Sequence, residues 1–324
     1  MTTEVLKNYK TFSQDDIAEM IKLVLVPFLA LLFFLAAWSI GASRVETSLG
    51  TLPGPASVWS QFTVLIDEHR AERTKEAAFY ERQEKRNAKK LAKNPDATVK
   101  IRPYTGKPTF FDQIMTSLYT VFTGFILGSL IAIPIGIISG LSNTMYRAIN
   151  PIVQVMKPVS PLAWLPIVTM VVSAVYVSSD PMFSKSFVTS AITVTLCCMW
   201  PTLINTAVGV SSIDKDLLNV SQVLRLNFMT KIWKIVLPSA MPMIFTGLRL
   251  SLGIGWMVLI AAEMLAQNPG LGKFVWDEFQ NGSSNSLSRI MVAVQVIGFI
   301  GFILDRGMLL LQKKVSWDKS AVLR

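Results

Sequence analysis

Long apolar runs without charge restrict what this chain can fold into more than any other feature of its sequence. A helix needs roughly 20 apolar residues to cross about 30 Å of hydrocarbon, and several runs reach that length. Charged residues make up only 16% of the chain, against about 25% in soluble domains. We therefore predict an all-α polytopic membrane protein with about six transmembrane helices, at residues 21–43, 110–141, 149–177, 186–208, 241–266 and 290–311.

The third of these runs is interrupted by prolines. Lys157-Pro158 and the stretch 161–166, which begins and ends with proline, break the apolar sequence. A proline removes a backbone donor, and inside a membrane the freed groups need neighbouring protein or a water-filled cavity. We therefore expect this broken span to line a cavity.

Small residues recur along the run 110–141. Gly124 and Gly128 form a small-xxx-small pair, and Ser129, Gly136 and Gly140 follow. Such residues let the backbones of two membrane helices approach closely. We expect this span to pack tightly against another one.

The charges between the spans set the predicted orientation. Residues 211–237 carry Lys215, Arg225, Lys231 and Lys234, and Lys and Arg accumulate in cytoplasmic loops. This loop is therefore assigned to the cytosol, and an even number of spans places both termini there as well. The predicted order is a cytosolic segment 1–20, the first span 21–43, a periplasmic segment 44–112, a transmembrane core 113–312 and a cytosolic tail 313–324.

Residues 68–107 form a charged insert within the periplasmic segment. They contain 12 Lys or Arg against 6 Asp or Glu, although loops longer than about 60 residues are translocated largely regardless of charge. The run 68–93 lacks Gly and Pro and predicts a solvated helix, while 57–67 has the apolar spacing of a short helix on the membrane surface. The insert is interpreted either as a decorated loop, or as a contact surface for a partner or a collector of anions.

The sequence offers no machinery for ATP hydrolysis or acid–base catalysis. The Gly-Lys pairs at 106–107 and 272–273 are not followed by Ser or Thr, so neither fits a phosphate-binding P-loop. His69 is the single histidine, and adjacent Cys197 and Cys198 match no metal-ligand spacing. Basic residues, which give a net charge of +10, concentrate in the insert and beside apolar runs, unlike a nucleic-acid groove. No catalytic residue, metal site, cofactor or nucleic-acid partner is predicted for this chain.

One cytosolic segment resembles the coupling motif of binding-protein-dependent ABC importers. That motif contains Glu-Ala-Ala, followed at fixed spacing by Gly and then by Leu-Pro. In this sequence Asn219 stands at the Glu position, Arg225 stands at the Gly position, and Leu237-Pro238 keeps the spacing. The variant Asn-Val-Ser-x-Val-Leu-Arg-Leu is itself usual in the nitrate permease branch. Further segments similar to that branch are 157–166, 245–249, 261–265 and 305–306, and the resemblance covers residues 113–316.

The resemblance implies the transmembrane domain of a type I ABC importer in a bacterial inner membrane. Its implied partners are a second copy of the chain, two cytosolic ATPase subunits that bind ATP and Mg, and a periplasmic or lipid-anchored solute-binding protein. The amphipathic coupling segment would dock in a groove of the ATPase. The residues of that segment are Asn219, Val220, Ser221, Gln222, Val223, Leu224, Arg225 and Leu226.

Nitrate, with nitrite, is the first solute that the resemblance implies. Bicarbonate and cyanate are alternatives because sister systems share these motifs, and alkylsulfonates such as taurine come next. A passive channel or a membrane scaffold is the alternative from a different class of function. Neither of these would need a coupling loop.

Ionisable residues inside apolar spans are candidates for a solute pathway, because a charge at the bilayer centre costs about 2.5 to 3.5 kcal/mol. We hypothesise that Arg249 and Lys157 set a positive field along an anion pathway, since a guanidinium suits a planar oxyanion. The alternative for Arg249 is a structural role, in which it pairs with a carbonyl or snorkels toward the cytosol. Glu263, Ser160, Trp164, Ser251 and Trp256 are the other candidates.

Overall fold

The computed structural model describes residues 14–47, 50–94, 98–178, 181–283 and 285–315. Within these ranges the chain is helical apart from loops and one pair of two-residue antiparallel strands, β1 (Glu46–Thr47) and β2 (Gly50–Thr51). The predicted all-α fold is confirmed, with this small hairpin as an addition. The predicted cytosolic segments 1–20 and 313–324 lie largely outside the described residues.

The number of membrane spans agrees with the prediction. Five helical stretches of the described chain are long and apolar enough to cross a membrane, and a bent pair of helices brings the number to six if the pair counts as one span. The five stretches are α1 (Gln14–Ala42), α3 (Phe110–Leu141), α6 (Lys185–Ser211), the continuous run Phe228–Ala266 that ends in α9 (Leu237–Ala266), and α11 (Ser286–Val315).

The bent pair corresponds to the predicted third span. It consists of α4 (Asn143–Met156) and α5 (Pro161–Val175), which meet at an angle of 100°. Pro158 and Pro161 disfavour helical backbone at the residues before them, and Ser160 caps α5 by accepting a hydrogen bond from the Leu162 N–H (3.3 Å). The break expected within the span 149–177 is confirmed, and it takes the form of a sharp corner between two helices.

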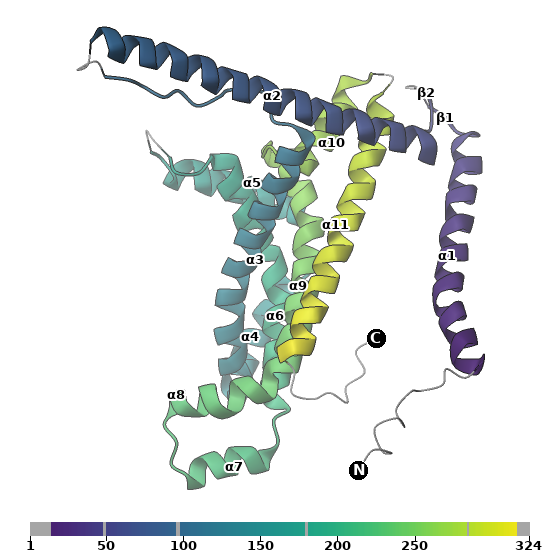
Figure 1. Ribbon diagram of the computed structural model, residues 1–324. Coiled ribbons are helices and arrows are strands. Elements are labelled where there is room, and N and C mark those ends of the chain that lie inside the picture. Colours follow the sequence, from purple (N-terminus) through teal and green to yellow (C-terminus); the bar gives the residue numbers. More distant parts are fainter. Residues whose placement is uncertain (1–13, 48–49, 95–97, 179–180, 284, 316–324) are drawn as a thin grey trace, which may run out of the picture.

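The helix α2 (Pro55–Lys93) is longer than the sequence indicated. A short surface helix at 57–67 and a separate charged helix at 68–93 were expected, but the structure joins them into one helix of 39 residues. The joint contains no Gly or Pro, so nothing interrupts the backbone hydrogen bonds. At 1.5 Å per residue the helix is about 58 Å long, and it lies across one end of the bundle (Figure 1).

The two ends of the bundle carry different elements (Figure 1). One end holds α2 and α10 (Leu271–Asn281), and the other holds α7 (Lys215–Val223) and α8 (Phe228–Lys231). The beginning of α1 and the end of α11 lie at the α7–α8 end. The predicted cytosolic loop and periplasmic segment require this arrangement, while the compartment that each end faces stays a prediction.

The centre of the bundle is built by α3, α6 and α9. Along α3 a small residue occupies every fourth position, and this row faces α6: Gly124, Gly128, Ala132, Gly136 and Gly140. A Cβ atom at Gly136 would lie 2.6 Å from Thr206 Cβ and 2.9 Å from the Leu203 carbonyl oxygen. Small residues with this spacing bring two helices into close contact without a hydrophobic driving force, as expected from the sequence.

Replacing Gly136 with leucine should therefore separate α3 from α6. Overpacking a well-packed contact costs about 1–3 kcal/mol or more, and here even the first added carbon collides with the partner helix. We expect a large fall in the midpoint of thermal unfolding in detergent, and size-exclusion chromatography after heating measures this midpoint. Gly298→Leu is the matched control, because a Cβ at Gly298 meets nothing within 4 Å; equal melting of the two variants would contradict the packing argument.

Candidate functional site

The predicted coupling segment lies in a helical hairpin that projects from one end of the bundle (Figure 1). Asp214 begins α7 by accepting a hydrogen bond from the Asp216 N–H (2.9 Å), and Asn227 begins α8 by accepting one from the Thr230 N–H (2.8 Å). A π-helical turn, η1 (Ile232–Val236), then connects α8 directly to α9. The hairpin is thus joined to α9, a candidate membrane span, without a non-helical linker.

The hairpin exposes large apolar side chains. Val223 is 82% exposed and Leu224 is 62% exposed. Their exposed apolar neighbours on the same hairpin are Leu217, Val220, Phe228, Met229 and Trp233. Exposed apolar clusters of this size mark interaction sites in soluble regions of proteins. Asn219 and Gln222 are also exposed, whereas Ser221 is buried and Leu226 is half-buried.

Arg225 ends α7 in a conformation that suits glycine better. Its φ is 47°, in the left-handed region. The Leu226 N–H donates to the Ser221 carbonyl (3.0 Å) and the Arg225 N–H donates to the Gln222 carbonyl (2.9 Å), which is the Schellman arrangement at a helix end. The family's glycine position therefore coincides with the one residue of this turn that has a positive φ.

Arg225→Gly should stabilise the turn while removing a charge. A left-handed conformation costs a non-glycine residue about 1–2 kcal/mol, so amide exchange at Leu226 should slow by up to about tenfold. Hydrogen exchange of the purified chain measures this directly. Arg225→Ala is the control, because it removes the same charge but keeps the strain, and slower exchange in both variants would assign the effect to charge instead.

A polar centre, separate from the hairpin, surrounds Glu263, which is fully buried. The Ser117 hydroxyl lies 2.9 and 2.8 Å from the two carboxyl oxygens and donates to them, and the Gly272 N–H donates to Oε2 (3.0 Å). Asn268 adds a longer contact of 3.4 Å. Gly272 lies in the first turn of α10, where a carboxyl group interacts favourably with free N–H groups and the helix dipole. Glu263 on α9 therefore holds α10 and α3 together.

Two glycines make room for this carboxyl group. A Cβ atom at Gly270 would overlap the Glu263 carboxyl group, and one at Gly272 would overlap the Ile260 carbonyl oxygen. The Leu271 N–H between them donates to Ser117 Oγ (2.8 Å). The turn 268–272 thus brings α10 onto the end of α9 through backbone groups.

Arg249 has a partner that lies far away in the sequence. Its Nε and Nη2 atoms donate to the two carboxyl oxygens of Asp305 on α11, at 2.5 and 2.8 Å. This bidentate geometry is the strong form of an Arg–carboxylate contact. Arg249 is 12 residues from the start of α9, Leu237, and 17 from its end, Ala266, so the pair lies near the middle of this helix.

The other predicted pathway residues divide into two groups. Ser251 and Trp256 are buried within the chain: Ser251 Oγ accepts from the Thr202 N–H (3.1 Å), and Trp256 Nε1 donates to the Ile297 carbonyl (3.0 Å). These contacts fix α9 to α6 and α11. Lys157 and Ser160 are exposed at the α4–α5 corner, and Trp164 is half-buried in the first turn of α5. Lys157, Ser160 and Trp164 are close in the sequence and lie at or just after the corner between α4 and α5. Arg249 instead contacts Asp305 on α11.

Several residues around Glu263 and Arg249 were not predicted as site residues from the sequence. Ser117, Asn268 and Asp305 contact Glu263 or Arg249. Ser117 is 146 residues from Glu263 and Asp305 is 56 residues from Arg249, while Asn268 follows Glu263 in the turn after α9. The only local signal was Asn268-Pro269-Gly270, which predicts a turn after the fifth span. It does not indicate what the turn binds.

Residues 132–317 match the family described as binding-protein-dependent transport system inner membrane component. The match covers the broken span, the hairpin with the coupling segment, and both centres apart from Ser117.

Several curated proteins are similar to this chain. The nitrate import permease protein NrtB of Leptolyngbya laminosa is 37% identical over 205 residues, which cover 62% of this chain and 68% of that protein. The bicarbonate transport system permease protein CmpB of Synechococcus elongatus is 33% identical over 291 residues, covering 90% and 88%. The taurine transport system permease protein TauC of Escherichia coli is 29% identical over 208 residues, covering 64% and 70%.

The fold is also similar to solved structures. An inward-facing form of the MetNI methionine ABC transporter aligns with a TM-score of 0.56 and 13% identity, over 63% of this chain and 95% of that one. A second crystal form of the same transporter gives a TM-score of 0.53 at 14% identity, over 64% and 95%. At these identities the likeness concerns the fold alone.

Proposed function

The chain belongs to the family of binding-protein-dependent transport system inner membrane components, and we propose that it is the permease of an ATP-driven importer of a small inorganic anion, nitrate or nitrite. Membership makes it a multi-pass inner-membrane component of an ABC transporter, distinct from the ATPase. The solute, the homodimer and the contacts with the other subunits are the proposal. The observation that carries it is the exposed apolar hairpin of α7 and α8, joined rigidly to α9.

Nitrate is the first candidate solute because the relatives named for nitrate import share the higher fraction of identical residues. Bicarbonate is the second candidate, because the relatives named for its transport match over 90% of the chain. Uptake of labelled nitrate into proteoliposomes, with bicarbonate, cyanate or taurine as competitor, separates these solutes. Nitrate import is refuted if excess unlabelled bicarbonate suppresses uptake and excess unlabelled nitrate does not.

The proposed assembly places two copies of the chain around a passage, with an ATPase subunit on each hairpin. ATP and Mg bind to those subunits, where ATP is hydrolysed, and the movement of the ATPase subunits reaches α9 through η1. The transmembrane chain itself supplies the passage for the solute and the hairpin that moves with the ATPase. A passive channel would show the same solute selectivity without any response to ATP, so the response to ATP distinguishes the two classes.

Val223→Ala combined with Leu224→Ala should uncouple the transporter. Removing two exposed apolar anchors from a docking surface costs roughly 1.5–3 kcal/mol in all, which corresponds to about tenfold or more weaker binding of the ATPase. The expected result is a loss of ATP-stimulated uptake and of ATPase co-purification. Val175→Ala with Val177→Ala is the matched control, because both side chains are strongly exposed but lie away from the hairpin. Equal coupling in the two variants would remove the hairpin from the mechanism.

A further inference from the structure

We propose that the outer half of α2, residues 82–93, is a docking surface for an acidic face of the soluble solute-binding protein. This inference rests on the proposed function, because that function supplies such a partner on the α2 side of the membrane. It concerns the charged insert, which the coupling mechanism does not use.

Charge is divided unequally along the insert. Residues 68–81 contain 3 basic and 4 acidic residues, whereas residues 82–102 contain 8 basic and 2 acidic residues. The first group is tied to the bundle: Arg73 pairs with Asp112 at the start of α3 (3.0 Å), and Glu68 pairs with Arg289 on α11. The inner half of α2 therefore anchors the helix, and the outer half carries the excess positive charge.

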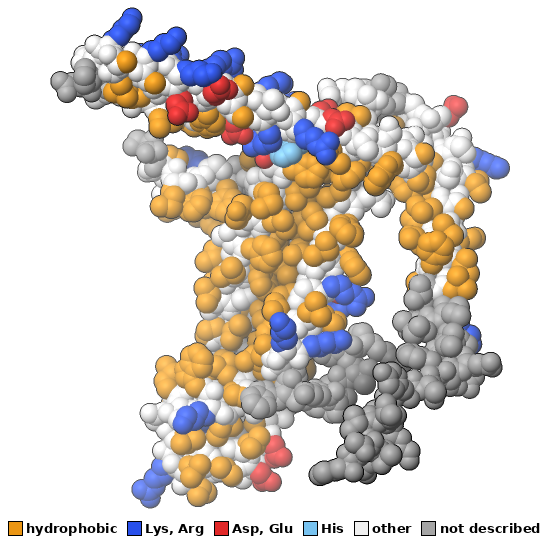
Figure 2. Space-filling model, viewed as in Figure 1, with side chains coloured by type: hydrophobic (Ala, Val, Ile, Leu, Met, Phe, Trp, Pro, Cys, Tyr) orange, Lys and Arg blue, Asp and Glu red, His pale blue; other side chains and the backbone are white. Residues whose placement is uncertain are grey.

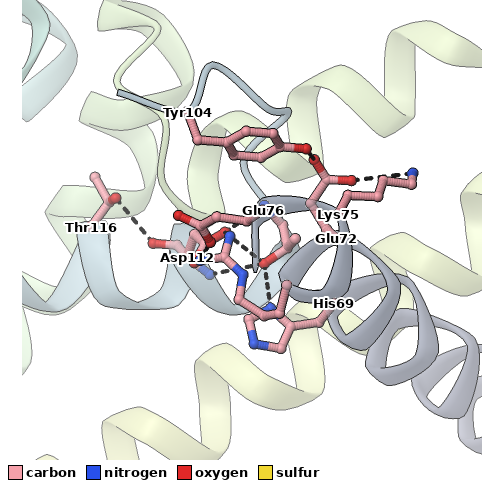
Figure 3. A network of polar contacts seen from close by, with 9 residues as sticks. His69, Glu72, Lys75, Glu76, Tyr104, Asp112 and Thr116 are labelled. Carbon is pink, nitrogen blue, oxygen red and sulfur yellow. Dashed lines mark hydrogen bonds and ion pairs between the residues drawn. The ribbon is translucent and has the colours of Figure 1, made fainter. Parts of the chain in front are cut away.

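The anchor is a network of polar contacts around the start of α3 (Figure 3). His69 Nδ1 lies 2.7 Å from Thr109 Oγ1, and the Tyr104 hydroxyl donates to Glu72 Oε1 (2.7 Å). This hydrogen bond lowers the pKa of Glu72 and raises the pKa of Tyr104. The returning segment 98–109 is thus fixed along α2.

The same returning segment also contacts α2 where its outer half begins. The Gln83 side chain, which is 4% exposed, accepts from the Arg102 N–H (2.9 Å) and donates to the Arg102 carbonyl (3.2 Å). The Tyr104 N–H donates to the Tyr80 hydroxyl (3.1 Å). These contacts fix the α2 backbone where its outer half begins, and a preorganised backbone reduces the entropy lost on binding a partner.

The basic side chains form one stripe on the exposed helix. They follow each other at positions i, i+3, i+4, i+7 and i+11, which share one face of a helix: Arg82, Lys85, Arg86, Lys89 and Lys93. Lys85 pairs with Glu81, and the other four have no ion-pair partner among the described residues. The opposite side of this part of α2 lines a groove with Val99 and Ile101, and it carries no basic residue there. The α2 residues that line the groove are Tyr80, Gln83, Glu84, Asn87, Ala88 and Leu91.

The direction of the stripe distinguishes between partners. Figure 2 shows Lys and Arg side chains along the edge of α2 that faces away from the bundle, and hydrophobic side chains along the edge that faces it. A helix that binds anionic headgroups directs its basic residues toward the membrane surface, alongside its apolar face. Here they point away from the bundle, and in the proposed orientation this direction is the compartment from which a soluble protein arrives. An acidic protein surface is the complementary partner, and such complementarity acts mainly on the rate of association.

The test measures association of the system's own solute-binding protein with the permease–ATPase complex in phosphatidylcholine nanodiscs. The variant is Arg86→Glu with Lys89→Glu, and the matched control is Lys313→Glu with Lys314→Glu, which makes the same change in net charge at the other end of the molecule. We expect an association rate about tenfold lower for the first variant at low ionic strength. The difference should vanish near 1 M salt, where the Debye length is about 3 Å.

The neutral variant Arg86→Gln with Lys89→Gln should give an intermediate rate, and unchanged helicity by circular dichroism should show that α2 is intact. Equal rates for the acidic variant and the wild type, or an equal loss in the control, would overturn the assignment. So would protection of α2 from hydrogen exchange that depends on phosphatidylglycerol and on Arg86 and Lys89, since this would assign the stripe to lipid. ATP-driven uptake by the wild-type complex is measured alongside: without it the proposed function fails, whereas uptake with equal binding rates refutes only the docking surface.

Discussion

Glu263→Ala is expected to destabilise the protein by roughly 3 kcal/mol or more, because it removes the acceptor of several buried donors at once. The Ser117 hydroxyl and the Gly272 N–H would lose their acceptor at a buried position, and each unsatisfied buried group costs about 1–3 kcal/mol. The cavity left by the side chain adds to this loss. The measurement is the midpoint of thermal or denaturant unfolding in detergent.

The effect should be localised at α10. Its first turn loses the carboxyl group that accepts from the Gly272 N–H, so amide exchange should accelerate from Leu271 onward while α6 stays protected. Glu263→Gln keeps the shape and one acceptor oxygen, and a smaller loss is expected. Glu84→Ala, at an exposed carboxylate on α2, serves as control. Wild-type melting of Glu263→Ala with full protection of α10 would show that the carboxyl group does not hold this junction.

Asp305→Leu should be as damaging as any single change in the transmembrane region, because it leaves Arg249 without its partner. An unpaired charge in the middle of a span costs about 2.5–3.5 kcal/mol. The two side chains are only 30% and 38% exposed, so removal of either one leaves the other half-buried without its partner, which is more costly than removal of both. Arg249→Leu should show a similar loss. The double variant, Arg249→Leu with Asp305→Leu, should recover most of the stability, as measured in a double-mutant cycle.

The same double variant tests the pathway hypothesis for Arg249. Because both carboxyl oxygens of Asp305 accept from its guanidinium, we expect Arg249 to act in joining α9 to α11. Saturable anion uptake with an unchanged KM is then expected in the double variant. A KM raised tenfold or more at wild-type stability would instead place Arg249 in contact with the anion. Lys157→Leu, at the exposed α4–α5 corner, provides the comparison for a pathway residue without an ion-pair partner among the described residues.

For the broken span and for α2, the sequence predicted the helices but not their directions in space. Pro158 and Pro161 predicted the break, because the effect of proline on the preceding residue is local. The bend of 100° depends on how α4 and α5 pack on their neighbours, which no local rule contains. In α2 the helical periodicity was evident from the sequence, but the direction of its basic stripe follows only from the attachment of Glu68 and Arg73 to the bundle.

The amino-acid sequence by itself determined the spans and the close contact made by the glycines of α3, whereas the coupling segment stays a prediction from a family resemblance. These depend on hydropathy, on helical period and on the size of side chains within one turn or one span, all of which are properties of neighbouring residues. Only the tertiary structure decided that Arg249 pairs with Asp305, 56 residues away, and that Ser117 meets Glu263 across 146 residues. Helix packing brings such groups together, because a buried polar atom must find its partner wherever the fold places one.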